Sequence, residues 1–159
     1  MSSEQTAEKF SPAQYNQFIA GLDLRGIRLL ETSVEAKVAG PVDKGTRVRL
    51  DYGGAWEDCD GGFRAFATYR VRFSLPGSRK ADARINSIWA VEFATPQPMT
   101  DALFGAFCEV NLRLNTWPYE RELVQSMLAR LDWPQLPLPL LKVPGRRMAV
   151  RRSPGPASD

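Results

Sequence analysis

Few kinds of side chain in this sequence could carry out catalysis, because its 159 residues include no histidine. Histidine is the commonest general base and transition-metal ligand, so Ser-His and Cys-His nucleophile pairs are excluded. The sequence also contains no GxxxxGK[ST] phosphate loop and no GxGxxG dinucleotide motif. Carboxylate or lysine chemistry stays open, but the prediction is a protein that is not an enzyme and uses no cofactor or metal.

The cysteines and the first residues bear on the cellular compartment. Cys59 and Cys108 are the only two cysteines, and their spacing does not suggest a disulfide staple. The first ten residues, MSSEQTAEKF, lack the basic and apolar regions of a signal peptide. No apolar run approaches the roughly 18 residues that span a membrane. We therefore expect a cytoplasmic protein that does not insert into membranes.

Composition predicts one ordinary globular domain, since 43% of the residues are hydrophobic and 25% are charged. The net charge of +3 is modest, and four arginines of a Pro/Gly-containing tail account for it. We predict a disordered N-terminus over residues 1–10, a single domain over 11–143 and a basic flexible tail over 144–159. Such a weak excess of positive charge favours solubility rather than nucleic-acid binding.

The elements that must position any site follow from the hydrophobic periodicity. Ser11, Pro12 and Gln14 form a helix start with a capping box, so we expect a helix over 12–23. Four segments then alternate apolar and polar residues, which predicts strands with one buried face: 25–38, 45–54, 62–75 and 83–93. After them the period becomes helical, which favours an α+β fold: a four-stranded antiparallel meander with one face covered by C-terminal helices.

The stretch NTWPYERELVQSMLARLDWPQLPLPLL, residues 115–141, holds a helix between two Trp-Pro pairs. We expect Pro118 in the first turn of that helix, where its missing N–H costs little. Pro134 should end the helix at Trp133, because the residue before a proline avoids the α region. Leu136, Leu138 and Leu140 alternate with prolines, so we predict an extended, packed strap.

These residues resemble the SecB family of export chaperones. WPYERE, residues 117–122, is similar to the family's aromatic-Pro-Tyr-x-Arg-Glu start, and PQLPL, 134–138, to its Pro-Gln-Leu-x-Leu continuation. Residues 104–108, FGAFC, resemble its Leu-Gly-Ala-Tyr-Cys, and 33–36, SVEA, the end of its first strand. The extra N-terminal helix, RGIRLLE and the PGRR that replaces a second C-terminal helix look more like a solitary branch associated with toxin–antitoxin systems.

The resemblance implies a chaperone that holds unfolded or nascent polypeptides extended without ATP, in protein export or in control of an antitoxin. It implies a homotetramer, built as a dimer of dimers, and an apolar groove between helix and sheet. The residues preferred for that groove are Trp56, Phe66, Trp117, Trp133, Leu136 and Leu138. Tyr119, Arg121 and Glu122 are assigned to the subunit interface, although Arg121 and Glu122 would equally suit a solvated helix start.

The polar face of the predicted sheet does not decide which partner the protein binds. Glu31, Glu35 and Glu92 match acidic positions that contact the translocase motor SecA in the family. The same face carries six basic residues: Lys37, Arg47, Arg49, Arg64, Arg70 and Arg72. Both SecA and an antitoxin therefore remain candidate partners. An alternative hypothesis is a nucleic-acid-binding module that uses Arg70, Arg72 and Phe66 on an exposed sheet. The sequence lacks the ribonucleoprotein motif that such modules carry.

Overall fold

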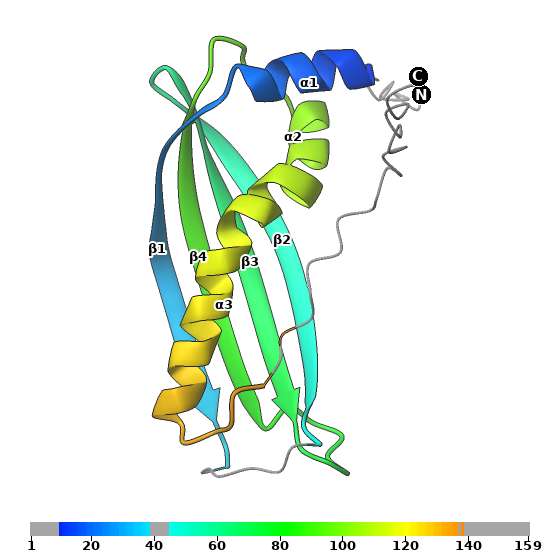
Figure 1. Cartoon of the computed structure of the whole chain (residues 1–159), viewed down its shortest axis with the longest axis vertical. Helices are drawn as coiled ribbons and strands as arrows, with labels where there is room; N and C mark the ends of the chain where they lie inside the picture. The colour runs from blue at the N-terminus through cyan, green and yellow to red at the C-terminus, as the bar shows by residue number, and fades with distance from the viewer. Residues whose placement is uncertain (1–9, 39–44, 137, 139–159) are drawn as a thin grey trace, which may run out of the picture.

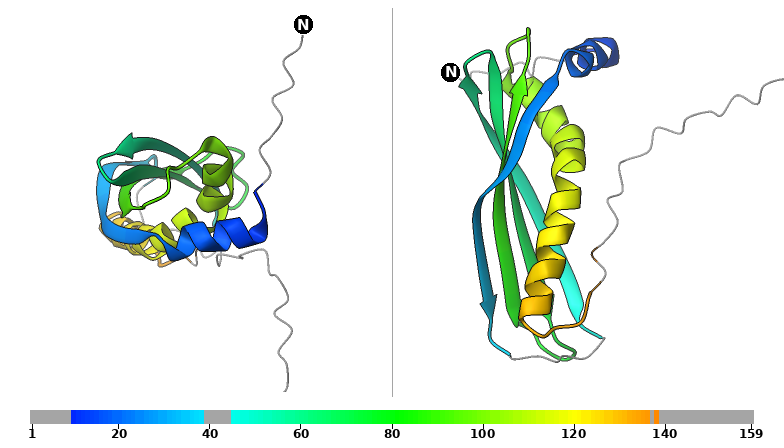
Figure 2. Two further views of the ribbon diagram at one scale, coloured as in Figure 1. Left: turned by 90° about the horizontal axis from the view of Figure 1, so that it is seen from above. Right: turned by 60° about the vertical axis from the view of Figure 1, so that its left-hand side comes forward.

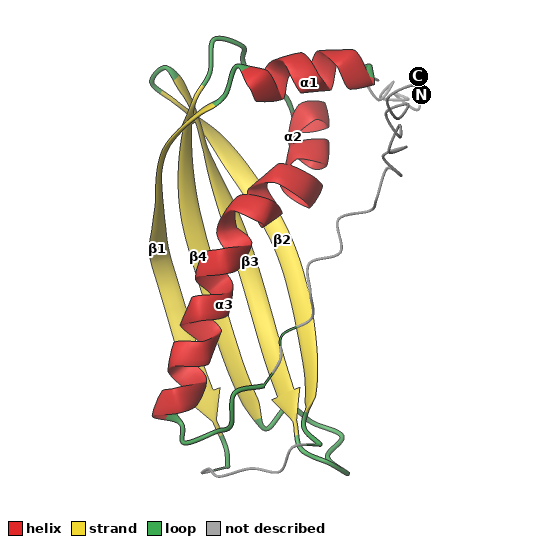
Figure 3. Ribbon diagram, viewed as in Figure 1, coloured by secondary structure: helices red, strands yellow, loops and turns green. Residues whose placement is uncertain are grey.

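A single antiparallel sheet carries all the helices on one of its faces (Figures 1 and 2). The computed structural model describes residues 10–38, 45–136 and 138, so residues 1–9 and the predicted basic tail lie outside the described part. The strands are β1 (Asp23–Ala36), β2 (Arg47–Cys59), β3 (Gly62–Ser74) and β4 (Ala83–Ala94). The helices are α1 (Pro12–Ala20), α2 (Asp101–Phe107) and α3 (Arg113–Arg130), and a π-helical turn, η1 (Cys108–Leu112), joins the last two (Figure 3). The predicted α+β class with a short N-terminal helix is confirmed.

The strand order is β1-β4-β3-β2, and every neighbouring pair is antiparallel. β2, β3 and β4 form the expected meander, but β1 lies beside β4 and not beside β2. The physical reason lies in burial. The side chains of β4 are largely buried, which suits an inner strand, whereas 13 of the 14 residues of β1 are exposed, which suits an edge.

The two faces of the sheet differ sharply. The inner face, under the helices, carries the apolar residues predicted from alternation in β3: Phe63, Ala65, Ala67, Tyr69, Val71 and Phe73, all fully buried. Ile85, Trp89, Val91 and Phe93 of β4 continue this layer. The outer face carries the alternate residues, which are mostly polar. The predicted buried face is absent in β1 and only half-buried in β2, because the long helix α3 packs over β3 and β4 (Figure 1).

α1 begins as its sequence predicts. The Ser11 side chain accepts from the Gln14 backbone N–H, and the Gln14 side chain accepts from the Ser11 N–H, which completes the capping box. Phe18 is buried and stacks on Phe63, with 6.3 Å between ring centroids, so the helix docks at one end of the sheet. α1 ends at Ala20, earlier than the predicted residue 23, because β1 already begins at Asp23.

The start predicted for the last helix is wrong. α3 begins at Arg113 and continues from η1, so Pro118 lies inside the helix. Proline in a helix interior leaves the carbonyl four residues earlier without its donor. Here that carbonyl belongs to Leu114, and both Leu114 and Pro118 are exposed, so water can take the place of the missing N–H.

The predicted end of the helix at the second Trp-Pro pair is confirmed. The Trp133 N–H donates to the Leu128 carbonyl and the Asp132 N–H donates to the Ala129 carbonyl, which is the Schellman arrangement. Asp132 adopts φ 54°, the left-handed conformation that this motif needs. The chain then leaves α3 as an extended segment that we call the strap, defined here by its described residues 133–136 and 138.

Candidate functional site

The strap packs against the inner layer beside α3. Trp133, Leu136 and Leu138 are 5%, 4% and 6% exposed, so all three belong to the core. The Trp133 ring meets Phe73 edge to face, with centroids 6.0 Å apart, and its Nε1–H donates to the Val38 carbonyl at 3.3 Å. Beyond the Trp133 N–H, no backbone hydrogen bond ties the described strap residues to the rest of the described chain. Apolar packing therefore holds the strap in place.

β2 forms the free edge of the sheet on the strap's side. Its inner-face side chains Val48, Leu50, Tyr52 and Trp56 are only half-buried, although they pack against the core. Trp56, at the far end of this row, donates from Nε1 to Asp101 at 3.0 Å and lies 6.2 Å from the Phe104 ring. This half-covered apolar row is the feature of the described structure that fits the predicted groove best.

The predicted groove residues do not all lie together. Trp56, Trp117 and Trp133 lie on the inner side with Leu136 and Leu138, but Phe66 lies on the outer face of β3 between Ala55 and Ala90. Trp117 is 5% exposed and contacts Tyr69 at a ring distance of 5.9 Å, so α3 holds it within the core. The sheet therefore separates Phe66 from the other five.

A buried polar cluster under α3 was not expected from the sequence. The Glu120 carboxylate is completely buried, and one of its oxygens accepts from Ser87 at 2.5 Å and from Trp89 Nε1 at 2.8 Å. Its other oxygen has no partner among the described residues. Burial raises the pKa of Glu120, and the two hydrogen bonds oppose that shift only in part. The i, i+4 spacing of Glu120 with Val124, which is buried on the packed face of α3, was the available signal for this burial.

Cys108 has a structural role. It is buried at the start of η1, and the Tyr52 hydroxyl donates to its backbone carbonyl at 2.8 Å. Burial raises the pKa of the Cys108 thiol, which keeps it protonated and unreactive at neutral pH. The cysteine therefore packs η1 against β2.

Exposed apolar side chains gather on β1. Leu24, Leu29, Leu30 and Val34 are between 38% and 55% exposed, and Leu29 is the cross-strand neighbour of Trp89. The exposed Tyr119 ring of α3 lies 5.9 Å from the Trp89 ring, so it extends this surface onto the helix. We call the four exposed residues of β1, Leu24, Leu29, Leu30 and Val34, the β1 strip. Arg121 and Glu122, two and three residues after Tyr119 in α3, are exposed and form no ion pair with any described residue.

The acidic residues of the outer face are in unequal situations. Glu92 accepts from Arg64 at 2.6 Å and lies 3.5 Å from Arg28, and the hydrogen bond from Arg64 lowers the pKa of Glu92. Glu31 and Glu35 lie on β1 with no ion pair in the described part of the chain. The three carboxylates therefore lie on one face, as predicted, but only two of them are unpaired.

The described residues contain no group of three or more Cys, Asp or Glu side chains able to hold a metal ion. No helix among them is long and apolar enough to cross a membrane.

The element order, the strand order and the placement of all helices on one face define the SecB-like α+β fold. A solved structure of the Rv1957 SecB-like chaperone of Mycobacterium tuberculosis, in complex with a ChAD peptide from the Rv1956 HigA1 antitoxin, matches with a TM-score of 0.69. The match covers 79% of this chain and 95% of that one, at 23% sequence identity. The predicted likeness to SecB is thus confirmed at the level of the fold. No protein-family model matches the sequence. No curated protein matches it either.

Proposed function

We propose that this protein is a SecB-like chaperone that holds polypeptide segments in an extended, unfolded state without ATP. The observation that carries the proposal is the SecB-like fold, shared over 95% of a chaperone whose solved complex contains an antitoxin peptide. The absence of histidine and of nucleotide-binding loops from the sequence agrees with a binding protein. We place its work in the cytoplasm.

The client site that we propose runs along the inner side of β2, from the strap to Trp56. The strap is itself an extended segment with leucines at alternate positions, 136 and 138, packed into an apolar layer. It resembles the kind of segment that a holdase binds, and its prolines deprive it of N–H donors. A client that offers both apolar side chains and a full set of backbone donors can therefore displace it.

The free edge of β2 suits such a client. Gly53, Gly54 and Ala55 are exposed, and a Cβ on Gly53 would meet nothing within 4 Å, so the backbone is accessible there. An extended chain that pairs with this edge gains main-chain hydrogen bonds that tolerate any sequence, and the half-buried Trp56 and Leu50 offer apolar contact. In this arrangement Leu136 and Leu138 occupy the groove until a client displaces the strap, Trp133 borders it, and Trp117 supports its floor.

We propose that a second copy of the chain covers the β1 strip. β1 has one free edge, and the exposed leucines beside it form an apolar surface that a monomer would leave in water. Pairing of β1 with β1 of another copy about a two-fold axis would bury this surface and join two sheets. Tyr119, Arg121 and Glu122 of α3 would then lie at the interface between such dimers in a homotetramer.

We propose an antitoxin, in preference to SecA, as the regulated partner. The likeness is to the toxin–antitoxin-associated side of the fold, and the antitoxin peptide of the solved complex is a polypeptide of the required kind. A SecA contact would have to use Glu31, Glu35 and Glu92 on the outer face, where Glu92 is already neutralised by Arg64.

The test is aggregation of a chemically unfolded client. Citrate synthase unfolded in guanidinium is diluted into buffer with and without the protein, in the absence of nucleotide, and light scattering is followed. We expect suppression that saturates near one tetramer per client. Unchanged scattering at a severalfold excess of protein would show that the protein is not a holdase.

A further inference from the structure

Three arginines lie side by side across the outer face of the sheet. Arg49 of β2 is the cross-strand partner of Arg72 of β3, and Arg72 is in turn the partner of Arg84 of β4. Neighbouring strands lie about 4.8 Å apart, so all three side chains start within about 10 Å of one another. Like charges directly opposite each other destabilise a sheet, so folding does not account for this row.

The row is only partly neutralised by the protein itself. Arg72 pairs with Asp51, but its Nε is buried without a partner among the described residues. Arg49 and Arg84 are exposed and form no ion pair within the described chain. Arg70, the next outward residue of β3, is likewise exposed and unpaired. We call Arg49, Arg70, Arg72 and Arg84 the arginine cluster.

The remaining acidic residues of this face offset the cluster only in part. Arg64 binds both Glu57, at 2.9 Å, and Glu92, at 2.6 Å, in a separate group nearer the other end of the strands. Glu35 of the edge strand β1 is the cross-strand partner of Arg84 and ends the row, and Glu31 lies farther along the same strand. The cluster therefore presents a small cationic area bounded on one side by carboxylates.

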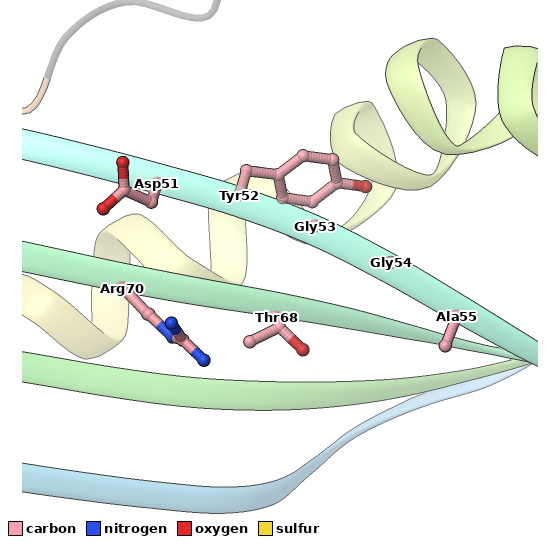
Figure 4. A pocket seen from close by; sticks show the side chains of 7 residues that line it. All are labelled: Asp51, Tyr52, Gly53, Gly54, Ala55, Thr68 and Arg70. Carbon is pink, nitrogen blue, oxygen red and sulfur yellow. The ribbon is translucent and has the colours of Figure 1, made fainter.

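Shallow depressions lie on both sides of Arg70. On the β2 side, a hollow of about 340 Å³ is lined by Asp51, Gly53, Ala55 and Thr68, among others (Figure 4). On the β4 side, a second hollow of about 210 Å³ is lined by Glu31, Ser33 and Asn86, among others. Each hollow thus holds one carboxylate of the protein itself, and the hydroxyl and amide groups beside it can donate to a carboxylate that approaches Arg70 from solvent.

We propose that the arginine cluster is a docking site for a short, acidic, extended polypeptide segment. Residues i and i+2 of an extended segment lie about 6.8 Å apart, so alternate carboxylates can reach Arg70 and either end of the row. This site lies on the outer face of the sheet, whereas the proposed client site lies on the inner side and edge of β2; Gly53 and Ala55 of that edge border both sites.

The chemistry of the face favours a peptide over a nucleic acid. A phosphate backbone that extended past the cluster would meet Glu31 and Glu35 on β1, whereas a short acidic segment can stop at the arginines. Phe66 is half-buried in line with Ala55 and Ala90, so it offers little of the exposed ring on which a base would stack.

The experiment measures binding of a fluorescein-labelled (Glu-Ser)5 peptide to the full chain by anisotropy at low salt. The probes for comparison are (Lys-Ser)5 and a 15-nucleotide oligothymidine. Arg70→Gln with Arg84→Gln should weaken binding of the acidic peptide about tenfold, since each exposed pairing is modest. Arg130→Gln removes one positive charge at the end of α3, as each cluster substitution does on the sheet. It should leave the peptide affinity within about twofold of the wild-type value.

A second readout separates function from folding. Arg49→Thr removes one like-charge opposition, so it should weaken peptide binding while raising the midpoint of thermal unfolding by roughly 1–3 °C. The proposal is overturned if the acidic peptide does not bind, if Arg130→Gln weakens it as much as the cluster variants, or if oligothymidine binds more tightly than the peptide. None of these results bears on aggregation suppression, so the proposed chaperone function stands or falls separately.

Discussion

Leu138→Ala distinguishes a strap that clients displace from a strap that is a fixed wall of the core. Leu138 is 6% exposed, and the substitution removes three carbon atoms from this buried position. At about 0.8 kcal/mol per buried carbon group, docking of the strap weakens by about 2.4 kcal/mol. This figure lies at the lower end of the usual cost of a buried Leu→Ala change, about 2–5 kcal/mol, as expected for a segment that can readjust.

The expected effect on client binding has the opposite sign to the effect on stability. If a client binds only when the strap is displaced, its apparent affinity is scaled by the fraction of molecules with an open strap. A shift of about 2.4 kcal/mol changes that equilibrium about 50-fold, so the client should bind between about 10-fold and 50-fold more tightly. The free energy of unfolding should fall by no more than the same 2.4 kcal/mol or so.

The assay pairs anisotropy of fluorescein-labelled, reduced and carboxymethylated α-lactalbumin with urea unfolding followed by circular dichroism. Leu22→Ala is the matched control, because Leu22 is a half-buried leucine at the opposite end of the sheet from the strap (Figure 1). It should lower stability and leave client affinity unchanged. Weaker client binding by Leu138→Ala would refute the reasoning, since Leu138 would then contribute to the binding surface.

Four further substitutions, one of them a control, test the site and its support. Because burial raises the pKa of Glu120 in the folded state, the wild type should lose stability as the pH rises through that pKa; Glu120→Gln should lose less between pH 4 and 8, and parallel melting curves would contradict this. Gly54→Ala places a Cβ against Cys108 Sγ and should cost about 1–3 kcal/mol in urea unfolding. Gly53→Ala, which meets nothing within 4 Å, should cost far less, and equal losses would argue against close packing of β2 on η1. Leu29→Lys in the β1 strip should reduce the mass measured by light scattering after size exclusion, and an unchanged oligomer would remove β1 from the interface.

Local signals in the sequence predicted much of the fold. The capping box of Ser11 and Gln14 and the helix end at Trp133 depend on neighbours in the chain, so short motifs describe them fully. The alternation in β3 predicted its buried residues because helices cover one whole face of that strand. The fold class followed from the order of these elements.

Features that depend on distant residues were not predictable in the same way. Alternation in residues 25–38 gave β1 correctly as a strand but could not say that it pairs with β4 or that no helix covers it. Pro118 was placed at a helix start because the sequence does not reveal that η1 and α3 are continuous. The burial of Glu120 was not predicted, since its partners Ser87 and Trp89 lie on β4, more than 30 residues away.

The candidate site shows the same limit. Phe66 was predicted to lie with Trp56, Trp117 and Trp133 because these aromatics lie off the simple inward pattern or at the ends of elements. The strand register instead places Phe66 on the other face of the sheet. The arginine cluster was equally hidden, because the alignment of Arg49, Arg72 and Arg84 in one row is a matter of strand register.

Site-specific photo-crosslinking tests the central claim most directly, namely that an unfolded client binds along the inner side of β2. Benzoylphenylalanine replaces Trp56 in one variant and Phe66 in another, and each is irradiated with a client freshly diluted from denaturant. Our account predicts a client adduct from position 56 and only background from position 66. An adduct from position 66 alone, or equal yields from both, would contradict it.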